Sequence, residues 1–589
     1  MSRAPLPDLW SGQTRWHALA LGSPLSLVQL WQDWRQTAQP TDRLFCTAIL
    51  SDVPSASDMV RLAVSQQLPE HLAHELGQAW RGLLPGVHRL PFEGDRVLWT
   101  LCIGPSRQML REIDTPVHQI TLAHWPDDDV SGPHTLKALA RLCQVGTTLR
   151  AVTGPTEHRQ GALMQCGFEP KESTDKSVLQ AVYAPRWAPR SKLRQSTGLA
   201  HRALVLGAGL SGSATAYSLA RRGWEVTVLD AGAAPGAGAS GLPAGLTAPH
   251  VSPDDHVLSR ITRAGVRATV QRAAALLQTG QDWGPTGVLE HRVGSKRGLP
   301  NGEAWPASGH EWSTPASTAQ LAQAGLPSQA QALWHGLGAW IRPRQLVSAQ
   351  LRHPGIQMHW HSHVTRFARE DGEWLALNAQ GQELGRAPVL VLAGGYDTLA
   401  LMRQGLPASV HLPLNPLRGQ ISMGPLSWLP ADTLQQLPPF PVNGHGSFIT
   451  GVPLPDGSGP GWYLGSTFER ACPEALLRES DHAANHARLA TLLPGLSEPM
   501  HGAFAPGEVQ AWAGLRCTLP DRLPAIGPLH DPRWPGLHVC AGMGARGISL
   551  SVLAGELIAA QLEGEPLPLA PSLAQHLATQ RFEERQART

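Results

Sequence analysis

The sequence predicts an α/β fold in two parts, and three patterns in the chain support that prediction. Residues 203–230 read as a buried strand, a glycine turn, a helix and a second strand. Residues 389–395 and 536–559 each contain an apolar run that leads into glycines. Residues 184–202, rich in Pro and Arg and free of acids, interrupt the apolar periodicity as a linker does. We therefore expect an N-terminal domain over 1–183, a linker over 184–202 and a C-terminal region over 203–589.

Length and composition narrow the class of protein. A chain of 589 residues is too long for one core, and a length prior suggests about three to four structural units. No run approaches the roughly 18 apolar residues of a membrane helix, and the first ten residues lack the apolar stretch of an export signal. The seven cysteines stand singly, without a CxxC or Cys/His cluster, so we expect neither a metal site nor disulfides. We predict a cytoplasmic protein that does not enter a membrane.

The net charge of +2 gives no overall electrostatic attraction for nucleic acid. A polyanionic partner would have to bind a local patch of basic residues.

The glycine turn at 203–230 carries the strongest chemical signal. Gly207, Gly209 and Gly212 form GxGxxG between a strand and a helix, and the next strand ends on Asp230. The first glycine permits a tight turn, the second lets the backbone approach a pyrophosphate, and the third allows close helix packing. The helix N-terminus attracts the anion, and the acid is placed to accept a hydrogen bond from a ribose hydroxyl. This unit predicts a bound dinucleotide.

Later glycine segments favour FAD over NAD. A buried strand at 389–392 runs into Gly394, and the segment 536–559 forms a strand, a loop containing Gly544 and Gly547, and a helix. A late strand–glycine–helix unit supplies a second helix N-terminus for the isoalloxazine of a long flavin.

Five segments of the C-terminal region resemble, in order, the oxidoreductase half of the MnmC family, the bacterial bifunctional proteins of tRNA 5-methylaminomethyl-2-thiouridine biosynthesis. The wider relatives are D-amino-acid-oxidase-like flavoenzymes, and the resemblance spans about residues 203–585. The segments are "GASGLPAGLTAPHVSPDDHVLSR" (238–260), "LPLNPLRGQIS" (412–422), "LGSTFER" (464–470), "GLRCTLPDRLPAIGPL" (514–529) and "GMGARGIS" (542–549).

The resemblance implies noncovalently bound FAD and oxidation of the carboxymethylaminomethyl group on the wobble uridine (position 34) of tRNA to aminomethyl. It also implies an FAD-binding Rossmann-type domain with an inserted substrate domain on a mixed or antiparallel sheet. The cofactor-binding residues carried over are Gly207, Gly209, Gly212 and Asp230 for the ADP moiety, Ala239, Ser240 and Gly241 beside the flavin or pyrophosphate, Gly394, and Gly544, Arg546 and Gly547 facing the flavin ring.

The substrate's carboxylate calls for a guanidinium, whose planar fork binds it bidentately. Arg418, Arg516 and Arg546 are the candidates, and the sequence does not rank them; Gln420 is a neighbouring candidate. Amine oxidation by flavin needs a neutral amine and accurate placement rather than a strong base, so no catalytic residue is assigned.

The N-terminal part resembles the later part of the family's S-adenosylmethionine-dependent methyltransferase half, over 83–110 and 136–170. The family's cofactor turn reads G-F-G-T-G-L-N-F, and here Gly22 alone remains of three glycines because Ala20 and Pro24 replace the others. Proline lacks the N–H that a ligand would need.

Three further ligand-facing positions of that half have changed. His118, Ala123 and Pro105 stand where the family has aspartates, and Asp52 is the nearest acid to the end of the second strand. We predict a degenerate Rossmann-like methyltransferase fold that has lost methyl transfer. The alternative that it still binds S-adenosylmethionine remains open.

Three other functions remain open. The chain could be a small-molecule amino-acid oxidase of the glycine or sarcosine type, or a still-bifunctional oxidase and methyltransferase. It could also be a non-catalytic flavoprotein or tRNA scaffold, with a docking surface through Arg141, Arg150, Arg159 and the linker arginines.

Overall fold

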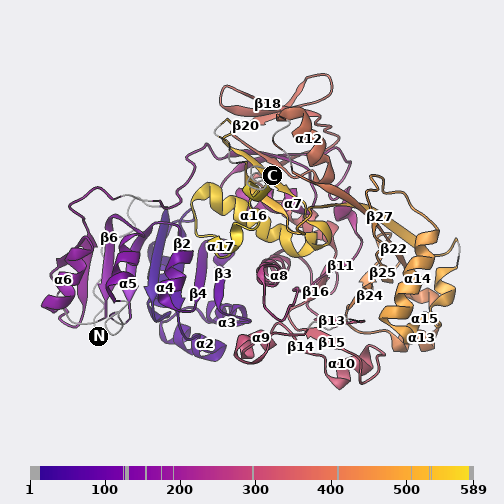
Figure 1. Ribbon diagram of the computed structural model, residues 1–589, viewed down its shortest axis with the longest axis horizontal. Coiled ribbons are helices and arrows are strands. Elements are labelled where there is room, and N and C mark those ends of the chain that lie inside the picture. The colour runs from indigo at the N-terminus through magenta and orange to yellow at the C-terminus, as the bar shows by residue number, and fades with distance from the viewer. Residues whose placement is uncertain are drawn as a thin grey trace. The chain divides into compact units, whose positions relative to one another are not determined.

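The computed structural model describes residues 14–123, 125, 132–152, 156–173, 175–189, 192–294, 298–407, 410, 412–505, 507–529, 531 and 533–582. The chain divides into two compact units (Figure 1). The first contains residues 1–197 and 560–572, and the second contains 198–559 and 573–589. The return of 560–572 to the first unit has no local signal in the sequence.

The first unit is built on one eight-stranded sheet of order β3-β4-β2-β1-β5-β6-β8-β7. The central strands β4, β2, β1, β5 and β6 are parallel, whereas β3 and β8 run in the opposite direction. The strands are β1 (Arg15–Leu21), β2 (Arg43–Leu50), β3 (Gly86–Phe92), β4 (Val97–Ile103), β5 (Val117–Leu122), β6 (Cys143–Ala151), β7 (Phe168–Lys171) and β8 (Leu179–Tyr183). The helices are α1 (Leu25–Thr37), α2 (Ala56–Ser65), α3 (Glu70–Ala79), α4 (Ser106–Met109), α5 (Gly132–Ala140) and α6 (Glu157–Gln165).

The strand order of the first unit reverses between β1 and β5, because the chain builds outward to β2 on one side and to β6 on the other. Doubly wound sheets bind ligands outside the carboxyl ends of their strands at such a point. The turn from β1 into α1 therefore occupies the position where a cofactor would bind. Trp31 and Trp34 of α1 pack into the core beside Trp99 of β4.

The second unit contains a six-stranded sheet of order β17-β10-β9-β21-β29-β28, parallel except for β28. Its strands are β9 (Arg202–Leu206), β10 (Glu225–Leu229), β17 (Ile356–His359), β21 (Val389–Leu392), β28 (Ala525–Pro528) and β29 (Leu537–Ala541). Small antiparallel sheets are formed by β11 (Gly245–Thr247), β16 (Ala339–Ile341) and β12 (Trp283–Gly284), and by β18 (Arg366–Glu370), β19 (Glu373–Leu377) and β20 (Glu383–Ala387).

A nine-stranded sheet is inserted between these strands, of order β14-β15-β13-β23-β24-β25-β22-β26 with β27 also paired to β22. It is antiparallel apart from the β13–β23 pair. The strands are β13 (Val288–His291), β14 (Thr314–Pro315), β15 (Ala332–His335), β22 (Asn415–Pro425), β23 (Val442–Gly444), β24 (Gly446–Pro453), β25 (Pro460–Gly465), β26 (Glu469–Arg470) and β27 (Gln510–Thr518). The parallel sheet and inserted mixed sheet confirm the predicted fold class.

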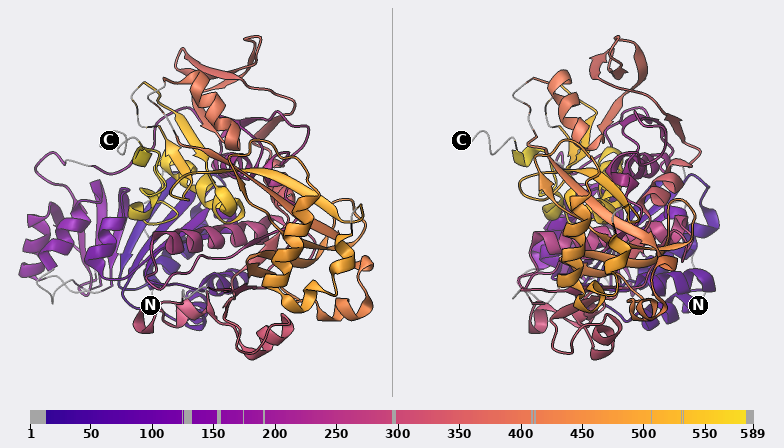
Figure 2. Two further views of the ribbon diagram at one scale, coloured as in Figure 1. Left: turned by 45° about the vertical axis from the view of Figure 1, so that its right-hand side comes forward. Right: turned by 90° about the vertical axis from the view of Figure 1, so that its right-hand side faces the viewer.

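The helices of the second unit include the long α8, which is visible in Figure 2. Partly buried Glu556 of α16 accepts hydrogen bonds from Arg222 beside α7 and from Arg272 of α8, and so joins the three helices. The helices are α7 (Leu210–Ala220), α8 (Val257–Leu276), α9 (Ala307–His310), α10 (Thr318–Gln323), α11 (Pro343–Leu351), α12 (Thr398–Gly405), α13 (Ala431–Gln436), α14 (Ser480–Leu492), α15 (Pro494–Ser497), α16 (Gly547–Glu563) and α17 (Pro571–Ala574), of which α16 and α17 extend across the division between the units.

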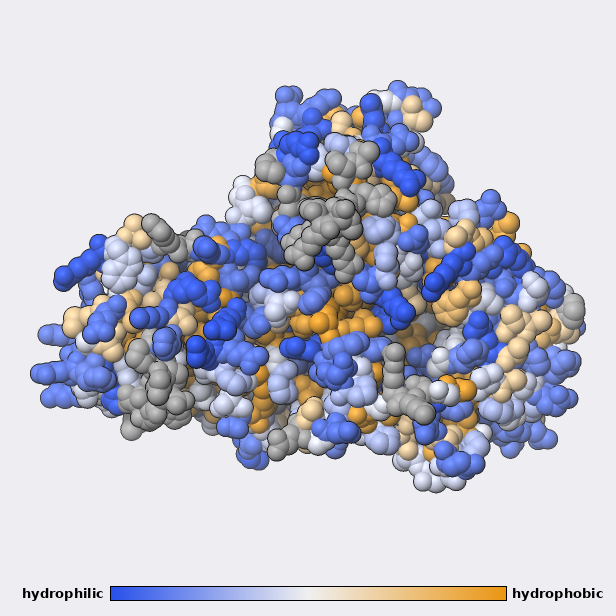
Figure 3. All heavy atoms as spheres, in the orientation of Figure 1, coloured by the Kyte–Doolittle hydropathy of each residue, from blue (hydrophilic) through white to orange (hydrophobic). Residues whose placement is uncertain are grey.

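One described helix, Gly544–Glu563, is long and apolar enough to cross a membrane, although the apolar runs of the sequence did not suggest one. Within the protein, 67% of its apolar window is buried, which is the environment of a core helix. Hydrophilic side chains cover most of the face seen in Figure 3.

Candidate functional site

The turn between β9 and α7 is packed too closely for side chains at two of its predicted glycines. Gly207 has a φ of 107°, and a Cβ there would lie 2.7 Å from the carbonyl oxygen of Ala393. A Cβ on Gly212 would overlap the carbonyl oxygen of Gly207. Gly209 precedes α7 as its N-cap, and the first helical turn carries no acidic side chain. The backbone N–H groups at this helix N-terminus can therefore approach an anion closely.

Asp230 fastens the same turn from the end of β10. Its Oδ2 accepts a hydrogen bond from the N–H of Ala208 at 2.6 Å, and its Oδ1 accepts one from Gly232 at 2.7 Å. A carboxylate can accept about four such bonds, so acceptor capacity remains for a ribose hydroxyl. Burial, and then the negative charge of Asp230, raises the pKa of nearby Asp397.

Strand β27 packs against three short loop elements that contain or adjoin the predicted flavin residues: η3 (Ala239–Gly241), η5 (Gly395–Asp397) and η8 (Gly544–Arg546). A Cβ on Gly241 would lie 3.5 Å from Nε1 of Trp512, and one on Gly544 would lie 3.4 Å from Cγ2 of Thr518. Side chains alternate along a strand, so Trp512, Arg516 and Thr518 share the face of β27 that meets these loops.

The Arg516 guanidinium is partly buried on that face. It hydrogen-bonds the hydroxyl of Ser466, and its Cζ lies 4.8 Å from the ring centroid of Phe468. A Cβ on Gly419 of the neighbouring strand β22 would overlap this guanidinium. Among the described residues no carboxylate pairs with Arg516, and burial lowers its pKa to about 10. Such a group is suited to a carboxylate on a ligand.

Arg418 and Gln420 lie on the opposite face of β22. Arg418 is fully buried and donates to Asp481 at 2.7 Å and to Gln420 Oε1 at 3.0 Å. Gln420 in turn donates to the carbonyl oxygen of Arg478 at 2.8 Å. These two predicted substrate residues are therefore bound to the segment that leads into α14.

The remaining predicted flavin residues lie in the loops around β27. Ser240 accepts a hydrogen bond from the N–H of Leu210 at 2.9 Å, so η3 is joined to the glycine turn. Gly394 follows β21, and Gly547 begins α16. Burial, and then the positive charge of Arg522, lowers the pKa of Arg546. Ala239 precedes Ser240 in η3, where it is exposed.

Sequence reasoning missed Gly419, Ser466, Phe468 and Trp512. A glycine inside a strand signals a close approach by another group, so Gly419 in "LRGQ" carried a readable signal. The other three depend on strand pairing between distant parts of the chain.

Within the described ranges, no three His, Cys, Asp or Glu side chains gather as a metal site. The site instead combines a glycine turn, a helix N-terminus and an acceptor carboxylate with further loops beside β27. These groups fit FAD, and Arg516 beside them pairs with no carboxylate of the described residues.

Comparison with known proteins defines the class. A family model described as FAD dependent oxidoreductase matches residues 202–561. The crystal structure of L-proline dehydrogenase from P. horikoshii shares the fold, with a TM-score of 0.51 at 16% identity over 67% of this chain and 99% of that one. The class is thus an FAD-dependent oxidoreductase, which confirms the predicted cofactor.

Closer relatives cover nearly the whole chain. The tRNA 5-methylaminomethyl-2-thiouridine biosynthesis bifunctional protein MnmC of Polaromonas naphthalenivorans is 43% identical over 96% of this chain and 90% of its own. The protein of the same name from Paracidovorax citrulli is 45% identical over 98% of this chain and 93% of its own length. The chain belongs to the MnmC family, as the sequence resemblance predicted.

In the first unit, the β1–α1 turn uses its polar groups internally. The N–H of Gly22 donates to the carbonyl oxygen of Ile49 at 3.0 Å, and Ser23 Oγ accepts from the N–H of Leu25 at 3.2 Å. Pro24 is the N-cap of α1 and has no N–H, while Ala20 is buried within β1.

Residues predicted to replace the family's aspartates also make other contacts. His118 Nδ1 accepts a hydrogen bond from the N–H of His17, and its ring stacks on Trp16 with centroids 4.9 Å apart. Pro105 caps α4, and Asp52 is exposed beyond the end of β2. Of the loop that follows Ala123, residues 124 and 126–131 lie outside the described residues.

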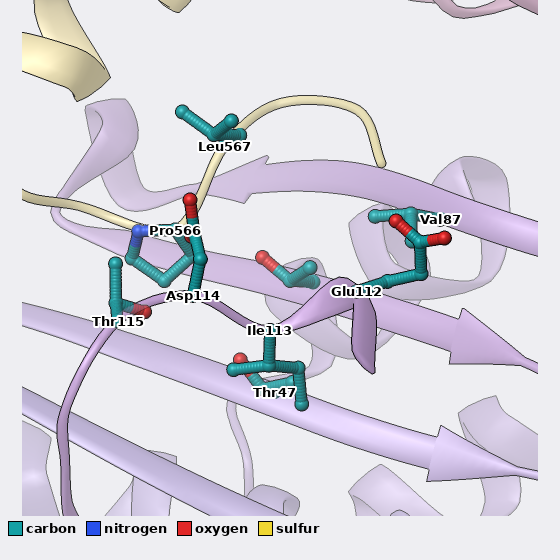
Figure 4. Close-up of a pocket in the computed structure, with 9 residues that line it drawn as sticks. Thr47, Val87, Glu112, Ile113, Asp114, Thr115, Pro566 and Leu567 are labelled. Atoms are coloured by element: carbon teal, nitrogen blue, oxygen red, sulfur yellow. The ribbon is translucent and has the colours of Figure 1, made fainter. Parts of the chain in front are cut away.

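Two cavities of the first unit are lined in part by segment 560–572. In the smaller one, Pro566 lies beside Asp114 and Thr115, and Leu567 also lines the cavity (Figure 4). Its volume of about 10 Å³ holds about one water. The larger, of about 460 Å³, lies at the amino ends of β1 and β5, beside His17 and His118. Burial lowers the pKa of His17 to about 3, so its ring is neutral. This cavity is at the opposite edge of the sheet from the β1–α1 turn.

Proposed function

We propose that this chain uses bound FAD to oxidise the carboxymethylaminomethyl group on the wobble uridine, position 34, of tRNA to an aminomethyl group. The relatives' names assign them to biosynthesis of tRNA 5-methylaminomethyl-2-thiouridine. Arg516 carries the proposal, because it is a partly buried guanidinium without an acid partner among the described residues, on the strand face that meets the three loops. A substrate that carries both an amine and a carboxylate fits that arrangement.

The cofactor would be held by groups already in place. Gly207, Gly209 and the N-terminus of α7 would hold the pyrophosphate, and Asp230 the ribose. The loops at 239–241, 394–397 and 544–547 would line the flavin. When bound, FAD accepts a hydride from a carbon next to an amine nitrogen.

Arg516 would bind the substrate's carboxylate and so fix the position of the carbon between carboxylate and nitrogen. The positive charges of Arg516 and Arg546 disfavour an ammonium beside them, which keeps the amine neutral for hydride loss. The resulting imine takes up water and releases glyoxylate, leaving the aminomethyl group. Arg418 and Gln420 would support β22 beneath Arg516, not contact the substrate.

We also propose that the first unit does not transfer methyl groups from S-adenosylmethionine. The supporting observation is the β1–α1 turn, where Pro24 offers no N–H and the N–H groups of Gly22 and Leu25 are already bonded. Methyl donors at Rossmann-like turns need a close backbone approach.

We place this reaction in the cytoplasm. All seven cysteines are free and six of them are buried, as is usual for a chain in a reducing compartment.

The test is incubation of the purified flavoprotein with tRNA that carries the carboxymethylaminomethyl nucleoside, followed by nucleoside mass analysis. We expect the aminomethyl nucleoside and one equivalent of glyoxylate, with no methylated product when S-adenosylmethionine is added. Parallel reactions with glycine and sarcosine test the small-molecule alternative. Turnover of those amino acids without turnover of the tRNA would overturn the proposal.

A further inference from the structure

Two arginines that pair with no acid of the described residues flank one exposed aromatic ring beside the proposed substrate site. Phe468 is 51% exposed, although it is a large apolar side chain. The Cζ of Arg516 lies 4.8 Å from its ring centroid, and the Cζ of Arg488 lies 5.6 Å from it. Phe468 follows the Ser466 that contacts Arg516, and Arg488 belongs to α14.

The charges of the surrounding arginines separate into two groups. Arg418 and Arg478 are paired with acids, at 2.7 Å from Asp481 and 2.6 Å from Glu469 respectively. Within the described part of the chain, Arg488 and Arg516 pair with no carboxylate, and Nε of Arg488 is buried without a hydrogen-bond partner. Arg488 and Arg516 are therefore two positive charges beside one aromatic ring. They suit a ligand that carries two anionic groups with a flat apolar surface between them.

We propose that Phe468 packs against the uracil ring of the substrate nucleotide and that Arg488 binds a phosphate of the same RNA segment. This inference rests on the proposed function and assigns the residues that select a nucleotide over a free amino acid. Unstacked RNA bases are recognised by aromatic side chains and guanidinium planes, and phosphates by arginine.

The dimensions of the substrate agree with this assignment. Four bonds of about 1.5 Å each join the carboxylate carbon to the uracil ring, a reach of about 5 Å. A carboxylate bound to Arg516 therefore holds the base within contact distance of Phe468. A glycine or sarcosine molecule has no group that reaches this ring, so Phe468 would contribute nothing to its binding.

The test compares Phe468→Leu and Phe468→Trp in the flavin-loaded enzyme. Leu keeps apolar volume but removes the aromatic face, so we expect kcat/KM for the modified tRNA to fall about 5- to 150-fold, the equivalent of about 1–3 kcal/mol for one stacked base. Phe468→Trp keeps an aromatic face and should therefore retain most of the activity. Trp428→Ala, an exposed aromatic beyond the far end of β22, is the matched control and leaves kcat/KM unchanged.

Arg488→Gln separates the phosphate contact from the stacking contact. We expect Arg488→Gln to weaken binding of the modified nucleoside 5′-monophosphate more than binding of the nucleoside. The slope of log K against log salt concentration for tRNA binding should also fall by about one. Phe468→Leu weakens binding of both ligands, as measured by calorimetry.

Wild-type kcat/KM in Phe468→Leu, or equal nucleoside affinity in Leu and Trp variants, would overturn the inference. If the wild-type protein oxidises no tRNA, the proposed function fails, and the nucleoside affinities of the variants still decide the role of Phe468.

Discussion

The turns β9–α7 and β1–α1 follow corresponding strands of two largely parallel sheets, yet they differ in the backbone groups that they present. In the second unit, the backbone at Gly207 and Gly212 packs closely against other backbone atoms, and Asp230 fixes the turn by accepting a hydrogen bond from Ala208. In the first unit, Ser23 bonds the first helical N–H and Pro24 removes another. Both turns keep the strand and helix that build a core. A strand–turn–helix unit can therefore fold with or without N–H groups presented to a ligand, because its packing does not depend on them.

The largest effect is expected at Gly212, where the β9–α7 turn is most crowded. Gly212→Ala places a methyl group on the carbonyl oxygen of Gly207, so the helix must shift away from the turn. We expect the purified variant to lack flavin absorbance and to lose about 1–3 kcal/mol of stability. Gly502→Ala, where a Cβ meets nothing within 4 Å, is the control and retains flavin. A yellow Gly212→Ala protein would contradict this account of the turn.

The next largest effect is expected for Arg516 and Arg418, which lie on opposite faces of the paired strands β22 and β27. Arg516→Gln removes the proposed carboxylate ligand, so kcat/KM should fall about 30- to 5,000-fold, the equivalent of about 2–5 kcal/mol. Arg418→Gln breaks a buried ion pair instead and should cost about 3–5 kcal/mol of folding stability. Steady-state kinetics and thermal unfolding of both variants check this division. Equal kinetic losses without a difference in stability would remove the distinction between the faces.

The stability of the first unit should depend on pH through the imidazole of His17. The pKa of His17 is about 3 when folded and 6.5 as the unperturbed value, so the unfolded state binds more protons between these values. The stability of the first unit should therefore fall as pH decreases from about 6.5 toward 3. His17→Gln should flatten that dependence, as measured by hydrogen exchange of β1. An unchanged slope in the variant would show that other groups control it.

The smallest effect is expected at the β1–α1 turn of the first unit. Wild-type protein should bind no S-adenosylmethionine in calorimetry at millimolar concentration. Pro24→Gly should not create binding and should change stability by only about 0.4–1 kcal/mol, since Pro24 has a φ of −76° that proline adopts without strain. Micromolar binding by the wild-type chain would restore the bifunctional alternative.

Local patterns in the sequence were sufficient to predict the strand, glycine turn and helix at residues 203–230. The spacing of Gly207, Gly209, Gly212 and Asp230 identified the strand, the helix and their order, because each residue acts through its own backbone conformation or its place at a strand end. The family resemblance followed from short segments of the same kind. The sequence also predicted that Ala20 and Pro24 replace glycines of the family's cofactor turn, since this is a change of residue type at a fixed position.

Tertiary structure alone decided which of the candidate arginines Arg418 and Arg516 is paired with an acid among the described residues. Arg418 and Arg516 both lie in strands and look equivalent in sequence, but the pairing of β22 with β27 puts them on opposite faces. Asp481 then neutralises one of them, whereas Gly419 leaves room for the other. The return of segment 560–572 to the first unit and the position of Phe468 beside Arg488 are of the same kind. Such contacts join residues far apart in the chain, and local residue patterns carry no record of which distant strand or helix will face them.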